Sequence, residues 1–143
     1  MERRAFLRRL PMLSAGVAAG AATLPLVACG GTRYLLPREA RDRLVVPLSF
    51  LPVGSDAFLQ TPSMERPIWV RRAGDEVTAL LARCTHRGCQ PEPVGDRLAC
   101  PCHGSEFSWT GEVLEGPAEF PLTRYEAAIE GDEVVVRLDR RVR

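Results

Sequence analysis

The residues of this chain that can bind a metal are concentrated in two short segments. The first is C-T-H-R-G-C at residues 84–89, and the second is C-P-C-H-G-S at residues 100–105. Both histidines of the chain and four of its five cysteines lie in these segments. Thiolates and imidazoles are ligands for soft and borderline metals such as iron and zinc. The sequence therefore predicts a metal centre to which both segments contribute.

Zinc binding and structural disulfides are two simpler uses of the same residues. A zinc site usually takes each pair of ligands from one knuckle or one helical turn, as C-x2–4-C and H-x3–5-H. Each segment here combines a cysteine with a histidine, and zinc would leave Cys89 and Cys102 without a role. Disulfides alone would leave both histidines without one. The pattern favours an iron–sulfur centre with two thiolate and two imidazole ligands over either alternative.

The two segments resemble those of the Rieske iron–sulfur proteins, in the disulfide-containing subgroup related to cytochrome bc complexes. The resemblance covers residues 43–143 and implies one Rieske-type 2Fe-2S cluster. It implies that Cys84 and Cys100 bind one iron, and that His86 and His103 bind the other. In such a centre the protein supplies ligands, hydrogen bonds and shielding from water, and the cluster carries the electron.

The resemblance also assigns a role to the additional cysteine of each segment. It implies that Cys89 and Cys102 form a disulfide that joins the two cluster-binding loops. Such a bond persists in an oxidising compartment outside the cytoplasm.

Several neighbouring residues are expected to influence the reduction potential. In the family, a serine at the position of Ser105 donates a hydrogen bond to a bridging sulfide and raises the potential. Two residues later the family usually has a tyrosine that donates to a ligand sulfur; Phe107 lacks this hydroxyl, so we expect a lower potential. Arg87 replaces the leucine usual in bc-complex proteins, and its charge suits an apolar quinone pocket poorly. Gly116 and Pro117 lie where the family has a loop that shields the cluster.

The chain from residue 43 onward has the pattern of short β-strands. β-rich runs occupy residues 44–48, 68–70, 77–81, 97–99, 106–109, 112–114, 122–129 and 133–138. Gly-Asp pairs between several of them predict turns, and no window predicts an amphipathic helix. The pattern predicts one all-β domain. The resemblance implies the Rieske fold of three stacked antiparallel sheets, with a cluster-binding part at residues 84–118 at one tip. We expect Trp109 and Phe120 to be core aromatics.

Residues 1–28 have the layout of an export signal. R-R-A-F-L at residues 3–7 matches the twin-arginine pattern, although any secretory signal has a basic start. An uncharged stretch follows and ends in L-V-A-C, which resembles a lipobox with Cys29 as the lipidated residue. The alternative is an uncleaved membrane anchor, because residues 10–28 are long enough to span a bilayer. Either reading predicts a protein tethered to a membrane and facing the periplasm or the cell exterior.

The segment from residue 29 to residue 42 is expected to be a tether, since it shows no periodic apolar face. The whole chain has 19 basic and 18 acidic residues, and all the basic ones are arginine. Removal of residues 1–28 leaves 15 arginines and 17 acids, for a net charge of −2. This balance gives no indication of nucleic-acid binding.

These observations lead to three function hypotheses. The first is a membrane-tethered electron carrier or electron-transfer subunit whose partner is a cytochrome, a copper protein or a larger oxidoreductase subunit. The second is the quinol-oxidising subunit of a cytochrome bc complex, and the third is the small subunit of a molybdenum enzyme similar to arsenite oxidase. A ring-hydroxylating oxygenase is excluded, because its catalytic iron needs two further histidines, which this chain lacks. We therefore expect no substrate site within this chain itself.

Overall fold

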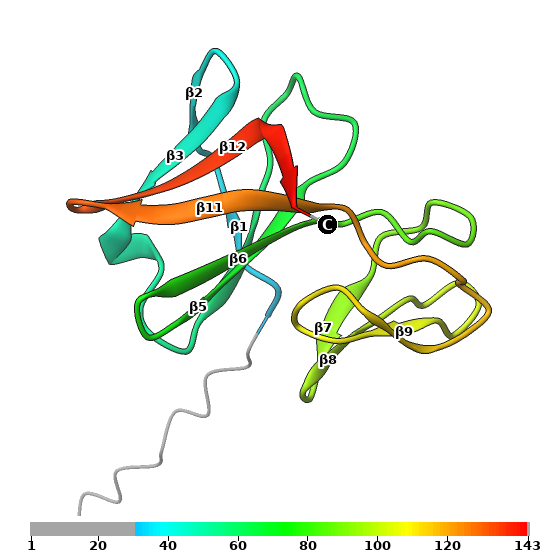
Figure 1. Cartoon of the computed structure of the whole chain (residues 1–143). Helices are drawn as coiled ribbons and strands as arrows, with labels where there is room; N and C mark the ends of the chain where they lie inside the picture. Colours follow the sequence, from blue (N-terminus) through cyan, green and yellow to red (C-terminus); the bar gives the residue numbers. More distant parts are fainter. Residues whose placement is uncertain (1–30, 143) are drawn as a thin grey trace, which may run out of the picture.

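Short strands form two sheets in the computed structural model, which describes residues 31–142. The described elements are β1 (Tyr34–Leu35), β2 (Arg38–Ala40), β3 (Arg43–Pro47), the 3₁₀ turn η1 (Leu48–Phe50), β4 (Asp56–Leu59), β5 (Ile68–Ala73), β6 (Glu76–Leu81), β7 (Glu92–Val94), β8 (Arg97–Ala99), β9 (Glu106–Phe107), β10 (Val113–Glu115), β11 (Arg124–Glu130) and β12 (Glu133–Val142). The larger sheet and the smaller sheet lie on opposite sides of Figure 1. The smaller one carries the two cysteine–histidine segments.

The larger sheet has eight strands in the order β1-β4-β5-β6-β11-β12-β3-β2. Strand β11 connects its two halves: Arg124 and Tyr125 pair with β6, while the whole strand pairs with β12. The register between β11 and β12 shifts between Tyr125 and Glu126. Such an irregularity bends a strand and increases its twist. The sheet therefore curls, and its two halves face each other across a shared core.

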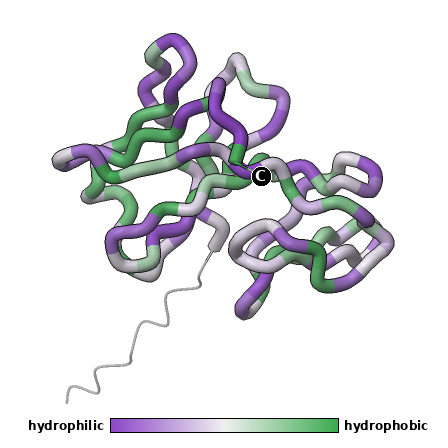
Figure 2. The backbone as a smooth tube through the Cα atoms, in the orientation of Figure 1, coloured by the Kyte–Doolittle hydropathy of each residue, from purple (hydrophilic) through white to green (hydrophobic). Residues whose placement is uncertain are grey.

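The body core lies between the two halves of the curled sheet. Alternate residues of β4, β5 and β6, such as Ala57, Ile68 and Val70, pack there against Val134 and Val136 of β12. The residues between them in β4–β6 point to the other face. Because both faces of β4–β6 are covered, these strands are apolar along most of their length, whereas the hairpin turns are hydrophilic (Figure 2).

A second core joins the body to the smaller sheet, whose strand order is β10-β9-β8-β7. Phe58, Trp69 and Leu80, from the second face of β4–β6, pack in it with Leu98 of β8 and Phe107 of β9. All five side chains are at most 1% exposed. The smaller sheet is therefore held by burial of large apolar side chains on the body.

The observed architecture confirms the predicted all-β fold and most of the predicted strands. The three expected layers are present, but the β12-β3-β2 layer and the β4-β5-β6 layer belong to one continuous hydrogen-bonded sheet. Strands β1, β2, β4 and β7, of two to four residues each, were not predicted. The prediction that Phe120 is a core residue is wrong, because its side chain is 66% exposed.

The predicted tether is shorter than its sequence indicated. Strand β1 pairs with β4, and β2 pairs with β3, so residues 34–40 belong to the sheet. Strand β1 pairs with a strand more than 20 residues away, whereas β2 forms a hairpin with the adjacent β3, and neither is long enough to show a period in the sequence. The predicted export signal and Cys29 lie outside the described residues. Within residues 31–142, no helix has the length and apolar character needed to cross a bilayer.

Gly111 provides a test of how tightly the two sheets are connected. Its φ is +93°, and a Cβ there would lie 3.0 Å from Leu80 Cδ2 and 3.4 Å from the Leu122 carbonyl oxygen. Gly131, also at positive φ (+63°), has open space around it. We expect Gly131→Ala to cost about 1 kcal/mol for the backbone conformation. Gly111→Ala should cost about 1–3 kcal/mol more, through overpacking.

Thermal unfolding followed by circular dichroism checks this prediction. The midpoint should fall by roughly 4 °C in Gly131→Ala and by roughly 8–16 °C in Gly111→Ala. Equal decreases of the midpoint in the two variants would show that backbone conformation, and not crowding against Leu80 and Leu122, explains the glycine at position 111.

Candidate metal centre

The two cysteine–histidine segments fold into loops of the same shape. In the first loop, the Cys84 N–H donates to the Cys89 carbonyl (2.7 Å) and the Gly88 N–H donates to the Cys84 carbonyl (2.7 Å). The second loop repeats this between Cys100 and Ser105 (2.7 Å) and between Gly104 and Cys100 (3.1 Å).

A glycine four residues after the cysteine allows each loop to turn. Gly88 has φ +79° and Gly104 has φ +80°, a backbone conformation that other residues adopt at a cost. In both segments a glycine follows the first cysteine by four residues. This shared spacing could have predicted the turns, but in the sequence we considered only the ligand types. The two loops are thus equivalent turns that present their first cysteine in the same way.

The two loops bring the first cysteine of each segment into the protein interior. Cys84 and Cys100 are each 3% exposed, and both thiols are free. Both belong to the second core, together with Leu98 and Phe107. A buried thiol pair of this kind is able to bind iron as thiolates from the inner side of the site.

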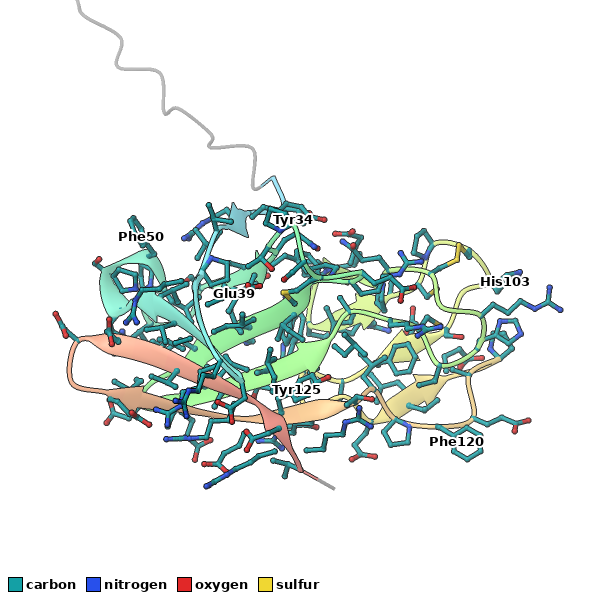
Figure 3. All side chains as sticks on the ribbon, turned by 90° about the horizontal axis from the view of Figure 1, so that it is seen from above. Tyr34, Glu39, Phe50, His103, Phe120 and Tyr125 are labelled. Carbon is teal, nitrogen blue, oxygen red and sulfur yellow. A yellow bond between two sulfur atoms is a disulfide. The ribbon has the colours of Figure 1, made fainter. Side chains whose placement is uncertain are left out.

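The two histidine rings lie on the outer side of the site, with centroids 4.8 Å apart and planes at 89°. His103 is exposed at one end of the molecule (Figure 3), whereas His86 is partly buried. His86 Nδ1 is fully buried and has no hydrogen-bond partner among the described residues. An unpaired buried nitrogen is costly unless another group binds it. The site therefore has the donor set of a mixed-ligand 2Fe-2S centre, with one imidazole nitrogen directed inward and lacking a partner.

Burial raises the pKa of the Cys100 thiol, and the neighbouring Cys84 adds to this effect. The backbone N–H groups of Cys102 and His103 act in the opposite direction and lower this pKa, because their dipoles favour the thiolate. Two buried thiolates without a cation would repel each other in a medium of low dielectric constant. A pair of ferric or ferrous ions supplies the missing positive charge, so these residues fit the cluster.

The remaining cysteines of the two loops form a disulfide, Cys89–Cys102, as the family resemblance implied. The sulfurs of Cys89, Cys100 and Cys102 all lie within 4.8 Å of one another. This trio is not a metal site, because a sulfur in a disulfide is not a thiolate ligand. The disulfide instead joins the loops directly beside the Cys100 sulfur, which limits how far they can separate.

Ser105 connects the second loop to residues 116–120. Its side chain is fully buried, and its Oγ accepts a hydrogen bond from the Ala118 N–H (3.0 Å). The hydroxyl proton of Ser105 therefore stays available for a second partner. Gly116 and Pro117 are exposed and lie immediately before this contact, joined by a cis peptide bond.

Thr85 connects the first loop to the same residues, 116–120, because its hydroxyl donates a hydrogen bond to the Phe120 carbonyl (2.6 Å). The sequence did not indicate this contact. Residues 116–120 are thus attached to both cysteine–histidine loops.

Two other predicted residues lie in contrasting surroundings. Phe107 is 0% exposed and packs in the same core as the Cys84 and Cys100 thiols. Arg87 is exposed on the first loop, next to His86. Trp109 is partly buried: its ring stacks on Trp69 (centroids 5.1 Å apart), as we expected of a core aromatic.

Known proteins similar to this chain share the same kind of iron–sulfur domain. The Rieske [2Fe-2S] domain family matches residues 28–126. A cytochrome b6-f complex iron-sulfur subunit from Chlorobaculum thiosulfatiphilum is 34% identical over 142 residues, covering 94% of this chain and 75% of the relative. One from Synechococcus sp. (strain JA-2-3B'a(2-13)) is 33% identical over 147 residues, covering 94% and 86%.

Solved structures share the fold. The cyanobacterial plasma membrane Rieske protein PetC3 from Synechocystis PCC 6803 matches with a TM-score of 0.51 and 35% identity, covering 57% of this chain and 85% of that one. A chain from the complex of reduced oxygenase and oxidized ferredoxin in carbazole 1,9a-dioxygenase matches with a TM-score of 0.59 and 26% identity, covering 73% and 100%. Since the family match spans residues 28–126 and includes both loops, the chain belongs to the Rieske [2Fe-2S] family of electron-transfer proteins and binds a 2Fe-2S cluster.

Proposed function

We propose that this protein is a one-electron carrier tethered to the exported face of a bacterial membrane. In this proposal Cys84 and Cys100 hold one iron of the cluster, and His86 and His103 hold the other. The observation that carries it is the pair of buried free thiols beside two perpendicular imidazoles, one of which has an unpaired buried nitrogen. The bound cluster supplies a single reversible electron.

The protein residues control how easily the cluster accepts its electron. The backbone amides of Cys102 and His103 favour the charged form of Cys100, and polar groups of this kind stabilise the more negative, reduced state. The hydroxyl proton of Ser105 is available to a bridging sulfide, because its oxygen already accepts from Ala118. The segment 116–120 and the second core exclude water from the thiolate side. Each of these features favours a higher reduction potential of the cluster. None of them requires a chemical step on a substrate.

The curated relatives support a second candidate, the quinol-oxidising iron–sulfur subunit of a cytochrome complex. They are iron-sulfur subunits of the cytochrome b6-f complex, and their matches cover nearly all of this chain. Arg87 argues for the carrier, because its exposed guanidinium beside His86 suits an apolar quinone poorly. The matched ferredoxin–oxygenase complex is a precedent for the fold in a complex of two redox proteins. No observation on the described residues favours the molybdenum-enzyme subunit.

The ligand assignment is tested by changing the histidines. His86→Ala and His103→Ala should each abolish the low-average-g electron paramagnetic resonance signal of the reduced protein, because an imidazole-bound iron is lost. The unchanged protein should contain two irons and two acid-labile sulfides. Arg41→Ala, on the β2–β3 turn, serves as the control and should keep the signal. Zinc without acid-labile sulfide in the unchanged protein would contradict the proposal.

Phe107 tests the predicted control of the potential. Phe107→Tyr places a hydroxyl in the core that contains Cys84 and Cys100. A hydrogen bond to a charged acceptor is worth about 1.5–3 kcal/mol. If about 1 kcal/mol of this differs between the two redox states, the potential rises by on the order of 40 mV. Protein-film voltammetry measures the shift, with Ser105→Ala expected to change the potential in the opposite direction.

Ser105→Ala also leaves the Ala118 N–H without its acceptor, so its thermal midpoint should fall as well. An unchanged or lowered potential in Phe107→Tyr, with the cluster spectrum intact, would show that position 107 does not face a ligand sulfur.

The tether is tested at Cys29. Mass spectrometry of the membrane-bound protein should find Cys29 as the acylated N-terminus, and Cys29→Ser should leave the chain unacylated. Firm anchoring needs more than one acyl chain. Recovery of an intact Met1 in the membrane fraction would instead support an uncleaved anchor.

A further inference from the structure

A positively charged groove lies directly beside the cluster site. It has a volume of about 690 Å³, and its lining includes His86, Phe120 and the arginines Arg83, Arg87 and Arg141. We call it the His86 groove. No carboxylate lines it, and within residues 31–142 none of its three arginines forms a salt bridge. Arg83 also lies against the Gly88 backbone, so its charge is held over the first ligand loop.

A second arginine-rich groove differs from the His86 groove in its balance of charge. It lies at the β2–β3 end of the body and is lined by Arg38, Arg41 and Arg43. Three carboxylates line it as well, those of Asp42, Glu130 and Glu133, and Arg38 pairs with Glu133 at 3.1 Å. Its charges therefore balance. Unbalanced positive charge occurs in the groove that contains the proposed iron ligand.

Phe120 adds an apolar contact to the His86 groove. Its ring is 66% exposed, although its backbone is fixed by the hydrogen bond from Thr85. Figure 3 shows Phe120 at the same end of the molecule as His103. Arginine and aromatic side chains are the residues most enriched at protein interfaces and at their energetic hot spots. An exposed, positioned phenylalanine beside three unpaired arginines has this composition.

We infer that the His86 groove is the docking site for an acidic redox protein. This inference rests on the proposed function, because the partner would receive its electron beside the ligand His86. One electron leaves the reduced cluster and reduces a Cu²⁺ or ferric centre of the partner by one unit; no proton or atom is transferred. A membrane surface is a weaker occupant, because the chain leaves the described structure near Tyr34, away from the end that carries Phe120 and His103 (Figure 3).

Binding can be measured without electron transfer. The probe is plastocyanin, an acidic copper protein, with both proteins reduced so that no electron moves. The full-length protein should bind it at low ionic strength, and Arg83→Gln/Arg87→Gln/Arg141→Gln should bind about tenfold more weakly. The difference should disappear near 1 M salt, where the Debye length is about 3 Å. Arg38→Gln/Arg41→Gln/Arg43→Gln removes the same charge from the balanced groove, and its affinity should stay within twofold of the unchanged protein.

Electron transfer supplies a second readout. Oxidation of the reduced protein by plastocyanin is compared with oxidation by mitochondrial cytochrome c, a basic protein. A change in the cluster potential would alter both rate constants in the same direction. Their ratio therefore depends less on the potential than either rate constant does. The groove variant is the one that carries Gln at positions 83, 87 and 141. We expect it to lower the ratio of the plastocyanin rate constant to the cytochrome c rate constant by at least tenfold at low salt. Phe120→Ala should weaken plastocyanin binding at high salt also, because a lost apolar contact is not screened.

The outcomes separate this inference from the proposed function. Equal effects of the two triple variants on plastocyanin would overturn the docking site while leaving the carrier intact. Loss of anionic-vesicle binding in the groove variant, with plastocyanin unaffected, would assign the groove to a membrane and also overturn the inference. Absence of the cluster signal, or of electron transfer to both oxidants in the unchanged protein, would count against the carrier itself.

Discussion

Two thiolates buried side by side are the constraint on which this structure depends. They are stable in a protein interior only when positive metal charge and donated hydrogen bonds offset their desolvation and their mutual repulsion. The chain meets this requirement with two equivalent turns. Each turn buries its cysteine, uses a left-handed glycine to reverse direction, and is closed by two backbone hydrogen bonds. The Cys89–Cys102 disulfide then keeps the two turns together.

The rest of the fold provides a rigid support for these turns. Neither loop contains a helix or a long strand, so their positions are determined by what lies behind them. Phe58, Trp69 and Leu80 present a large apolar surface on the outer face of β4–β6, and the small sheet buries its own side chains against it. The body in turn is closed by the bend in β11, which brings β12 and β3 over the inner face. Burial on both faces of the middle layer thus connects the cluster site to the body core.

The two sides of the cluster site differ in a way that suits an electron carrier. The two thiols lie in the second core together with Ala118, whereas His103 is exposed and His86 borders an open groove. In the proposed site the imidazole side is open to an electron acceptor, whereas the thiols are buried. The charge around this side is also uneven, because no carboxylate lines the His86 groove and its arginines form no salt bridge within residues 31–142. Long-range attraction of this kind steers a partner before contact is made.

Much of the site could be predicted from the sequence because its chemistry depends on residue types at short range. Two histidines and four cysteines within 22 residues admit few metal centres, and the ligand loops are short enough for their spacing to be read directly. Strands such as β5, β6 and β8 were predicted for a similar reason, since their apolar residues and the Gly-Asp turns beside them are local features.

Tertiary structure decided what depends on pairing between distant residues. Strand β1 gains its hydrogen bonds from the distant β4, so the predicted tether contains sheet that its own residues do not indicate. Phe120 resembles a core aromatic in the sequence, but the hydrogen bond from Thr85 to its carbonyl holds this segment at the surface. The His86 groove brings Arg141 of the last strand beside Arg83 and Arg87. The sequence determined the cluster and led to its proposed ligands through local spacing, whereas the surface that surrounds it arises from residues that meet only when the sheets pack.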